Sequence, residues 1–162
     1  MSKINLTLAP LLAGGGSTVA AALVAALQND AELASILGTY GVWLSPVPET
    51  QSMPFIVVTL PPGNMARYTG GVAGRRTEDY TLAIVGNSAI ALRQASARIG
   101  GPQPPAGNGM FEQQPGALVV PGWSIAQIFA QEQGFRGERG KDAQGREVYS
   151  AWSQISVTAW PQ

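Results

Sequence analysis

The run Phe55–Leu60 constrains the fold more than any other segment, because proline bounds it on both sides. Pro54 precedes this strongly apolar run, and Pro61-Pro62-Gly63 follows it. Proline cannot donate to a strand ladder and occurs mainly at strand ends or edges. The run is therefore predicted to be one strand with sharp limits, and the chain must contain a sheet that includes it.

Further strands are predicted on both sides of this run. In the segment Thr77–Gly86, the side chains of Tyr80, Leu82 and Ile84 share one face, because strand side chains alternate. The last two strands are expected to pair as a hairpin. Besides Phe55–Leu60, the predicted strands are Val42–Leu44, Thr77–Gly86, Trp123–Glu132 and Val148–Trp160.

The segment Gly134–Arg146, between the last two predicted strands, is expected to be a long solvated loop. It holds six of the twenty charges of the chain. Two other segments, Asn64–Arg76 and Gly100–Gly122, are rich in glycine or proline and are predicted to be irregular.

Three segments have the three-and-four apolar spacing of amphipathic helices. The first is expected to begin at Ser17 or Thr18 and to bury Val19, Leu23, Val24 and Leu27. In the second, Asn29 and Glu32 form a start that resembles a capping box, and Gly38 ends the helix. The third is expected to be capped by Asn87 or Ser88, to end at Gly100-Gly101, and to bury Leu92, Ala95 and Ile99.

These elements predict an α+β fold in one domain. We expect a mostly antiparallel sheet of about four to five strands backed by two to three helices, with a long hairpin loop. Residues 1–16 are interpreted as an N-terminal arm that ends in a glycine run, and residues 17–162 as the domain.

Neither histidine nor cysteine occurs in the 162 residues. A site built on this chain would lack the imidazole base, the thiolate and the usual ligands of zinc or haem. Glu78 and Asp79 are adjacent on a predicted strand, so they point to opposite faces and cannot act as a catalytic pair. We therefore expect no enzyme, no catalytic residues, no metal site and no cofactor.

The charge of the chain is low and balanced. Only 12% of the residues are charged, whereas about 25% is typical. Because interface cores are depleted in charge, this composition favours a surface largely covered by partners. The formal net charge is zero and no basic run is present, which argues against a dedicated or sequence-specific nucleic-acid binder. No apolar stretch is long enough to predict a membrane span.

The last predicted strand has two unlike faces. Tyr149, Ala151, Ile155, Val157 and Ala159 fit a core face. The opposite face is polar but uncharged and carries two tryptophans: Trp152, Gln154, Ser156, Thr158 and Trp160. Such a face suits contact with another protein. Coverage by a helix of the same chain would explain it equally well, and the sequence leaves both open.

Candidate contact residues are the loop charges and the two tryptophans of this strand. A ring of subunits would multiply each loop charge around its axis, although such charges can also serve only solubility. The candidates are Arg75, Arg76, Arg136, Glu138, Arg139, Lys141, Arg146, Trp152 and Trp160.

The order of the predicted elements resembles the tail terminator, or tail-completion, proteins of long-tailed bacteriophages. The similarity covers roughly residues 17–160, and its most specific part is Met53-Pro54-Phe55-Ile56-Val57-Val58 after the helix pair. The family implies an α+β subunit that forms a hexameric ring at the head-proximal end of the tail tube.

The resemblance also implies partners and a location. Such a ring binds the tail tube protein, stops tube polymerisation and joins the tail to the connector or stopper protein of the head. DNA only passes through its lumen. The protein would belong to the neck of the virion and assemble in the cytoplasm of the bacterial host. Two alternatives remain at this point: a head-completion or connector protein that closes the portal, and a small non-viral ligand-binding domain.

Overall fold

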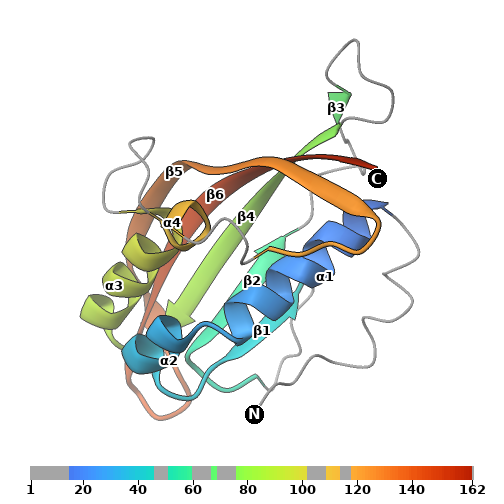
Figure 1. The fold of residues 1–162 in the computed structure, drawn as a ribbon. Helices are drawn as coiled ribbons and strands as arrows, with labels where there is room; N and C mark the ends of the chain where they lie inside the picture. Colours follow the sequence, from blue (N-terminus) through green and yellow to red (C-terminus); the bar gives the residue numbers. More distant parts are fainter. Residues whose placement is uncertain are drawn as a thin grey trace.

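The protein has an α+β fold in which one mixed sheet carries its helices on a single side (Figure 1). The fold was examined in a computed structural model, which describes residues 15–45, 51–59, 67–68, 76–101, 109–113 and 118–161. The expected fold class is confirmed. The predicted arm, residues 1–16, falls outside the described residues except for its last two.

The sheet has six strands in its described part, one more than the four to five expected. The extra strand is β3, a two-residue piece within the segment predicted to be irregular. β1 and β2 pair in parallel, and the other pairs are antiparallel. The main order is β1-β2-β4-β6-β5, with β3 beside β4. The strands are β1 (Gly41–Leu44), β2 (Phe55–Thr59), β3 (Arg67–Tyr68), β4 (Arg76–Gly86), β5 (Trp123–Lys141) and β6 (Glu147–Pro161).

Four helices are described: α1 (Gly15–Gln28), α2 (Ala31–Leu37), α3 (Ala89–Gly100) and α4 (Met110–Gln113). The cap of α3 is Ser88, whose side chain accepts from Ala91 N–H, as expected. The predicted capping-box start of α2 at Asn29 is wrong. Asp30 caps that helix and accepts from the N–H of Leu33, three residues on. α1 begins at Gly15, so two glycines assigned to the arm belong to the helix.

The core lies between the sheet and the helices. β4 contributes the side chains of Tyr80, Leu82 and Ile84, which are 0% exposed, as the alternation predicted. Burial of each such apolar side chain contributes about 1.5–3 kcal/mol, so this layer fixes the orientation of the sheet. The helix residues predicted to face the core are also buried: Val19, Leu23, Val24, Leu27, Leu92, Ala95 and Ile99.

The hydropathy of the helices was compared with what a membrane span requires. No single described helix is long and apolar enough to cross a membrane; only the bent pair Val19–Gln28 and Ala31–Leu37 meets the length and composition limits when taken together.

The predicted long loop Gly134–Arg146 is wrong in its extent. β5 continues to Lys141, so residues 142–146 alone connect it to β6. The pairing is irregular there, with a register shift between Arg136 and Gly140. Glycines and charges hid the strand pattern, because a bulged strand loses its strict alternation. The hairpin is therefore long, but its loop is short.

Candidate interface on the sheet

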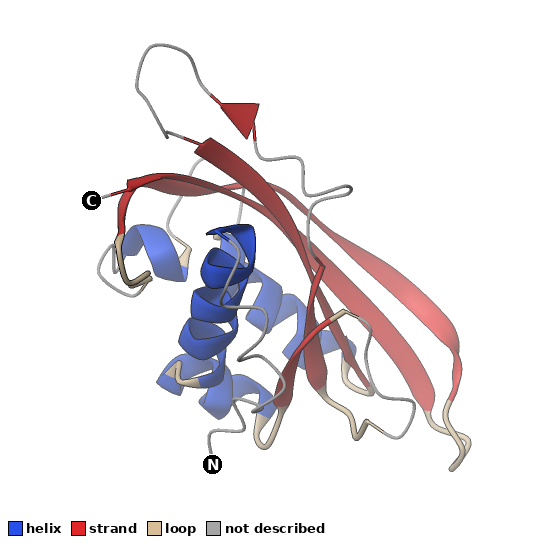
Figure 2. Cartoon of the chain, turned by 90° about the vertical axis from the view of Figure 1, so that its right-hand side faces the viewer, coloured by secondary structure: helices blue, strands red, loops and turns tan. Residues whose placement is uncertain are grey.

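The two faces of β4 and β6 differ in what covers them. Figure 2 shows all described helices on one side of the sheet, and the side chains of Tyr80 and Ile155, paired across the strands, point to that side. Residues one position away point to the other side. We call these the outer face: Thr77, Asp79, Thr81, Ala83 and Val85 of β4, and Ser150, Trp152, Gln154, Ser156 and Thr158 of β6.

This arrangement bears on one of the two explanations of the uncharged face, coverage by a helix of the same chain. No described helix of the chain covers the outer face (Figure 2). Thr81, Ala83, Trp152 and Gln154 are each partly exposed. A described helix therefore does not explain the uncharged face, and contact with another protein stays a prediction.

The outer face carries a single charge among its ten residues. The carboxylate of Asp79 accepts a hydrogen bond from the Ser156 hydroxyl at 2.8 Å. Thr77 and Thr158 share a hydroxyl hydrogen bond of 2.8 Å across the same two strands. Ser156 and Thr158 are buried by their surroundings. Because these polar groups already have partners, a docking molecule would meet a surface with one charge, Asp79, whose polar groups need little further desolvation.

Trp152 is fixed on the outer face by a glycine of the neighbouring strand. A Cβ atom built on Gly134 would lie 2.5 Å from Cε2 of the Trp152 indole. Only glycine leaves room for the ring, because a real Cβ never comes so close to another heavy atom. The half-buried indole therefore lies against the β5 backbone, and aromatic side chains held in this way are typical anchors of protein interfaces.

The end of the β5–β6 hairpin is anchored to the domain. The Asn87 amide, just before α3, donates to the Glu147 carbonyl at 2.8 Å and to the Asp142 carboxylate at 3.2 Å. Arg146 forms an ion pair of 2.9 Å with Asp142. Desolvation opposes ionisation of Asp142, but its hydrogen bonds with Arg146 lower the pKa of this carboxyl below its ordinary value. The hairpin is thus a structured projection.

The nine predicted contact residues fall at different places on the sheet. Arg136, Lys141 and Arg146 are exposed near the hairpin end. Trp152 lies in the middle of the outer face. Arg75 is outside the described residues, and only the backbone is described for Arg76, Glu138, Arg139 and Trp160.

The hairpin end and the opposite end of the sheet do not form one site. Arg76 pairs with Ala159, next to Trp160, whereas Arg146 precedes the first residue of β6. A strand of 15 residues spans about 50 Å. The candidate residues at the two ends therefore do not meet within one subunit, and their role as contacts stays a prediction.

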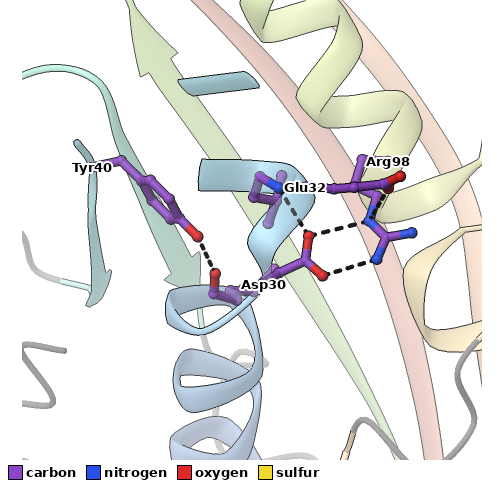
Figure 3. Close-up of polar contacts among 6 residues, drawn as sticks. Asp30, Glu32, Tyr40 and Arg98 are labelled. Carbon is purple, nitrogen blue, oxygen red and sulfur yellow. Dashed lines mark hydrogen bonds and ion pairs between the residues drawn. The ribbon is translucent and has the colours of Figure 1, made fainter. Parts of the chain in front are cut away.

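The helix side contains a polar cluster that the sequence analysis missed. Arg98 of α3 binds Asp30 with its Nη2 at 2.8 Å and its Nε at 3.1 Å. The same Nε lies 2.8 Å from the Glu32 carboxylate. Figure 3 shows the guanidinium between the two acids. The Arg98–Asp30 ion pair joins the start of α2 to α3. It is nearly buried, because the side chains of Arg98 and Asp30 are 8% and 7% exposed.

The cluster shifts two titrations. Burial opposes ionisation of Asp30, but hydrogen bonds from Arg98 and Leu33 hold the pKa of this carboxyl below its ordinary value. Tyr40 donates its hydroxyl to the Leu27 carbonyl (Figure 3). Burial, with a smaller effect of the Asp30 charge, raises the pKa of Tyr40 to about 12. These contacts stabilise the fold, because they join α2 to α3 and the end of α1 to Tyr40.

The two acids of β4 are separated by the sheet, as predicted. Glu78 is 4% exposed on the helix side, where Tyr80 donates to it, and Asp79 lies on the outer face. Among the described residues, no three of the types His, Cys, Asp and Glu gather as metal ligands.

Comparisons with known proteins were made on sequence and on fold. No protein-family model matches the sequence, and no curated protein matches it either. The chain is similar to a chain in a solved structure of the virion of a native gene transfer agent particle. The two are 18% identical, with a TM-score of 0.48, over 86% of this chain and 97% of the other. This is a likeness in the course of the chain, and no role follows from it.

Proposed function

We propose that the chain is a structural protein of a phage-like virion and acts as a tail terminator. Copies of it would form a ring on the head-proximal end of the tail tube, stop further tube polymerisation and offer a docking surface to the head connector. The chain binds and positions other proteins and performs no catalysis.

The outer face of the sheet carries this proposal. It is a surface of β4 and β6 with one charge among ten residues, and no described helix covers it (Figure 2). Trp152 is fixed at its centre by Gly134. The low fraction of charged residues in the whole chain, 12%, supports a protein whose surface is largely covered by partners.

The element order supports the choice of a tail terminator within this class. A helix pair, the proline-preceded strand β2, the unit of β4 and α3, and the closing hairpin follow one another in the order on which the resemblance rests. The ring, its six-fold stoichiometry and its partners, the tail tube protein and the head connector, are part of the proposal. The location in the virion neck belongs to it too.

The proposed mechanism depends on two different contact surfaces on each subunit. A head-to-tail contact joins unlike patches of neighbouring subunits. Such contacts form a closed ring when the successive rotations between neighbours add up to one full turn. The ring would bind the last tube ring with one side and present a different chemistry on its other side. A tube subunit that arrives next then finds no complementary surface, and polymerisation stops.

A connector that faces DNA is the alternative within the virion. It would need basic side chains gathered on one surface. At the described hairpin end, Lys141 and Arg146 alternate with Asp142 and Glu147, which does not favour such a surface.

Electron microscopy of particles made without this gene tests the proposal. Overlong or irregular tails beside full, unattached heads are expected, because nothing would cap the tube. Tails of normal length beside heads that lose DNA would support the connector instead. Intact, infectious particles would refute a structural role in the virion.

A further inference from the structure

Strand β1 forms the edge of the sheet that carries no bulge, charge or proline. Among the described strands it pairs only with β2, in an unbroken parallel register. Its sequence, Gly-Val-Trp-Leu, has no charge and no proline. The opposite edge, β5, has three register shifts and several charges. Bulges and charges prevent an edge from pairing with another chain, so β1 is the edge open to an added strand.

One side chain already occupies part of this edge. The Ser45 N–H binds the β2 carbonyl of Val58 at 3.0 Å, so the peptide groups of Val42 and Leu44 point away from β2. The carboxamide of Gln28 accepts from Val42 N–H at 3.2 Å and donates to the Tyr40 carbonyl at 3.3 Å. The Gln28 carboxamide thus occupies the position at which a peptide group of an added strand would pair with β1. Two long hydrogen bonds hold it there.

A cleft of about 620 Å³ lies beside the start of β1. Its lining includes Gln28, Tyr40, Trp43 and Gln51, and contains no charged residue. The indole N–H of Trp43 is buried and has no hydrogen-bond partner within the described part of the chain. A cleft lined without charged residues suits the backbone of an extended polypeptide better than a charged ligand.

A segment of this chain has the pattern of such a strand. In residues 3–9, Ile4, Leu6 and Leu8 alternate with Lys3, Asn5 and Thr7. This period of two is typical of a strand with one apolar face. The apolar face would continue the layer of the half-buried Leu44 and Ile36 at the edge of the core. The five residues between this segment and α1, 10–14, can span about 17 Å.

We propose that residues 3–9 of one copy add as a strand to β1 of a neighbouring copy and displace the Gln28 carboxamide. The proposal rests on the ring of the proposed function and names the contact that links its subunits. In a single chain Gln28 holds this edge, and no described strand of the same chain lies on its free side. If each copy donates residues 3–9 to the next copy, the contact is head-to-tail, and such contacts can form a closed ring.

Two substitutions on opposite faces of the segment test the pairing. Leu6→Asp places a charge on the apolar face, and Thr7→Asp places the same charge on the polar face. Sedimentation velocity of the full chain is expected to show association weakened at least 30-fold by Leu6→Asp and less than 3-fold by Thr7→Asp. The thermal midpoint of the monomer should stay unchanged in both. Equal effects of the two variants, or none, would overturn the proposal.

Cross-linking identifies which copy supplies the strand. The chain has no native cysteine, so Thr7→Cys can be combined with Thr39→Cys or Ser45→Cys, which are exposed positions at the two ends of β1. Oxidation is expected to give covalent dimers and higher oligomers for at least one pair. The matched control is Thr7→Cys with Gln144→Cys, in the hairpin loop, which should stay uncross-linked.

The outcomes separate this proposal from the proposed function. Cross-links only within one chain, or none in a chain that assembles normally, would overturn the exchange and leave the ring intact. A chain that stays monomeric alone and with tail tubes would refute the ring itself.

Discussion

The polar cluster on the helix side and the outer face of the sheet differ in how many charges they carry and in what pairs with their polar groups. In the cluster, Arg98 is held between Asp30 and Glu32, and the charges are matched within one chain. The outer face has one charge among ten residues; there the hydroxyls of Thr77 and Thr158 bind each other across the strands, and the Ser156 hydroxyl donates to Asp79. The cluster thus serves the fold of one subunit, whereas we propose that the outer face is a contact surface for another molecule.

The largest effect is expected from a substitution that disrupts the polar cluster. Asp30→Asn retains a good helix cap but leaves the buried Arg98 guanidinium without its main partner, which should lower the free energy of unfolding by about 3 kcal/mol. Denaturant unfolding at pH 7 measures the loss. Glu32→Gln is the control, since Glu32 is 67% exposed, and it should cost less than about 1 kcal/mol. Equal losses in the two variants would contradict a buried pair.

The pH dependence of this pair follows from the lowered pKa of Asp30. Its ionised form is stabilised by folding, so the contribution is present above the ordinary value of 3.8 and is lost as the pH falls through the lower folded value. Asp30→Asn should remove that part of the acid sensitivity. The same acid transition in both proteins would contradict the assignment.

The second prediction compares a lysine placed on the outer face with a lysine placed on the helix side. Gln154→Lys puts a cation on the outer face opposite Thr81, and Gln94→Lys makes the same change on the exposed side of α3. Burial of an unpaired charge at an interface costs at least about 2 kcal/mol, so Gln154→Lys should weaken association roughly 30-fold. Gln94→Lys should leave it unchanged. Analytical ultracentrifugation distinguishes them, and similar association constants would argue against the outer face as a contact surface.

The third prediction concerns Tyr40, whose hydroxyl donates to Leu27 on the helix side. The pKa of Tyr40 is raised from 10.0 to about 12, so its contribution is present below pH 10 and is lost as the pH rises through 12. Tyr40→Phe should lower the free energy of unfolding by about 1 kcal/mol at neutral pH. It should also lose less stability than the parent between pH 10 and 12. A parallel alkaline decline in both would contradict this role.

The smallest effect is expected at the hairpin end. Arg146 is 61% exposed in its pair with Asp142, so Arg146→Ala should produce no measurable change in the thermal midpoint. A calorimetric scan of both proteins checks this. A clear drop would mean that the hairpin end depends on this pair more than on the Asn87 anchor.

The elements whose limits come from local chemistry were predictable from the sequence. Pro54 marks the start of β2, and Ser88 caps α3. The alternation in β4 indicated which side chains face the core, because this pattern depends only on strand geometry. The uncharged face of β6 was visible for the same reason.

Features that depend on contacts between distant residues were not predictable. The ion pair of Asp30 and Arg98 joins residues 68 positions apart, and no local pattern signals it. The extension of β5 to Lys141 was hidden because its irregular pairing breaks the alternation. The placement of all described helices on one side of the sheet, which leaves the outer face uncovered, is also a property of the assembled fold (Figure 2).

Hydroxyl-radical footprinting of the assembled and monomeric protein tests most directly whether the outer face is an interface. Trp152 reports on this face, and Ile90, which is 72% exposed at the start of α3, is the internal reference on the helix side. The account predicts that assembly with subunits or tail tubes lowers Trp152 oxidation several-fold and leaves Ile90 unchanged. Equal oxidation of Trp152 in both states would contradict it.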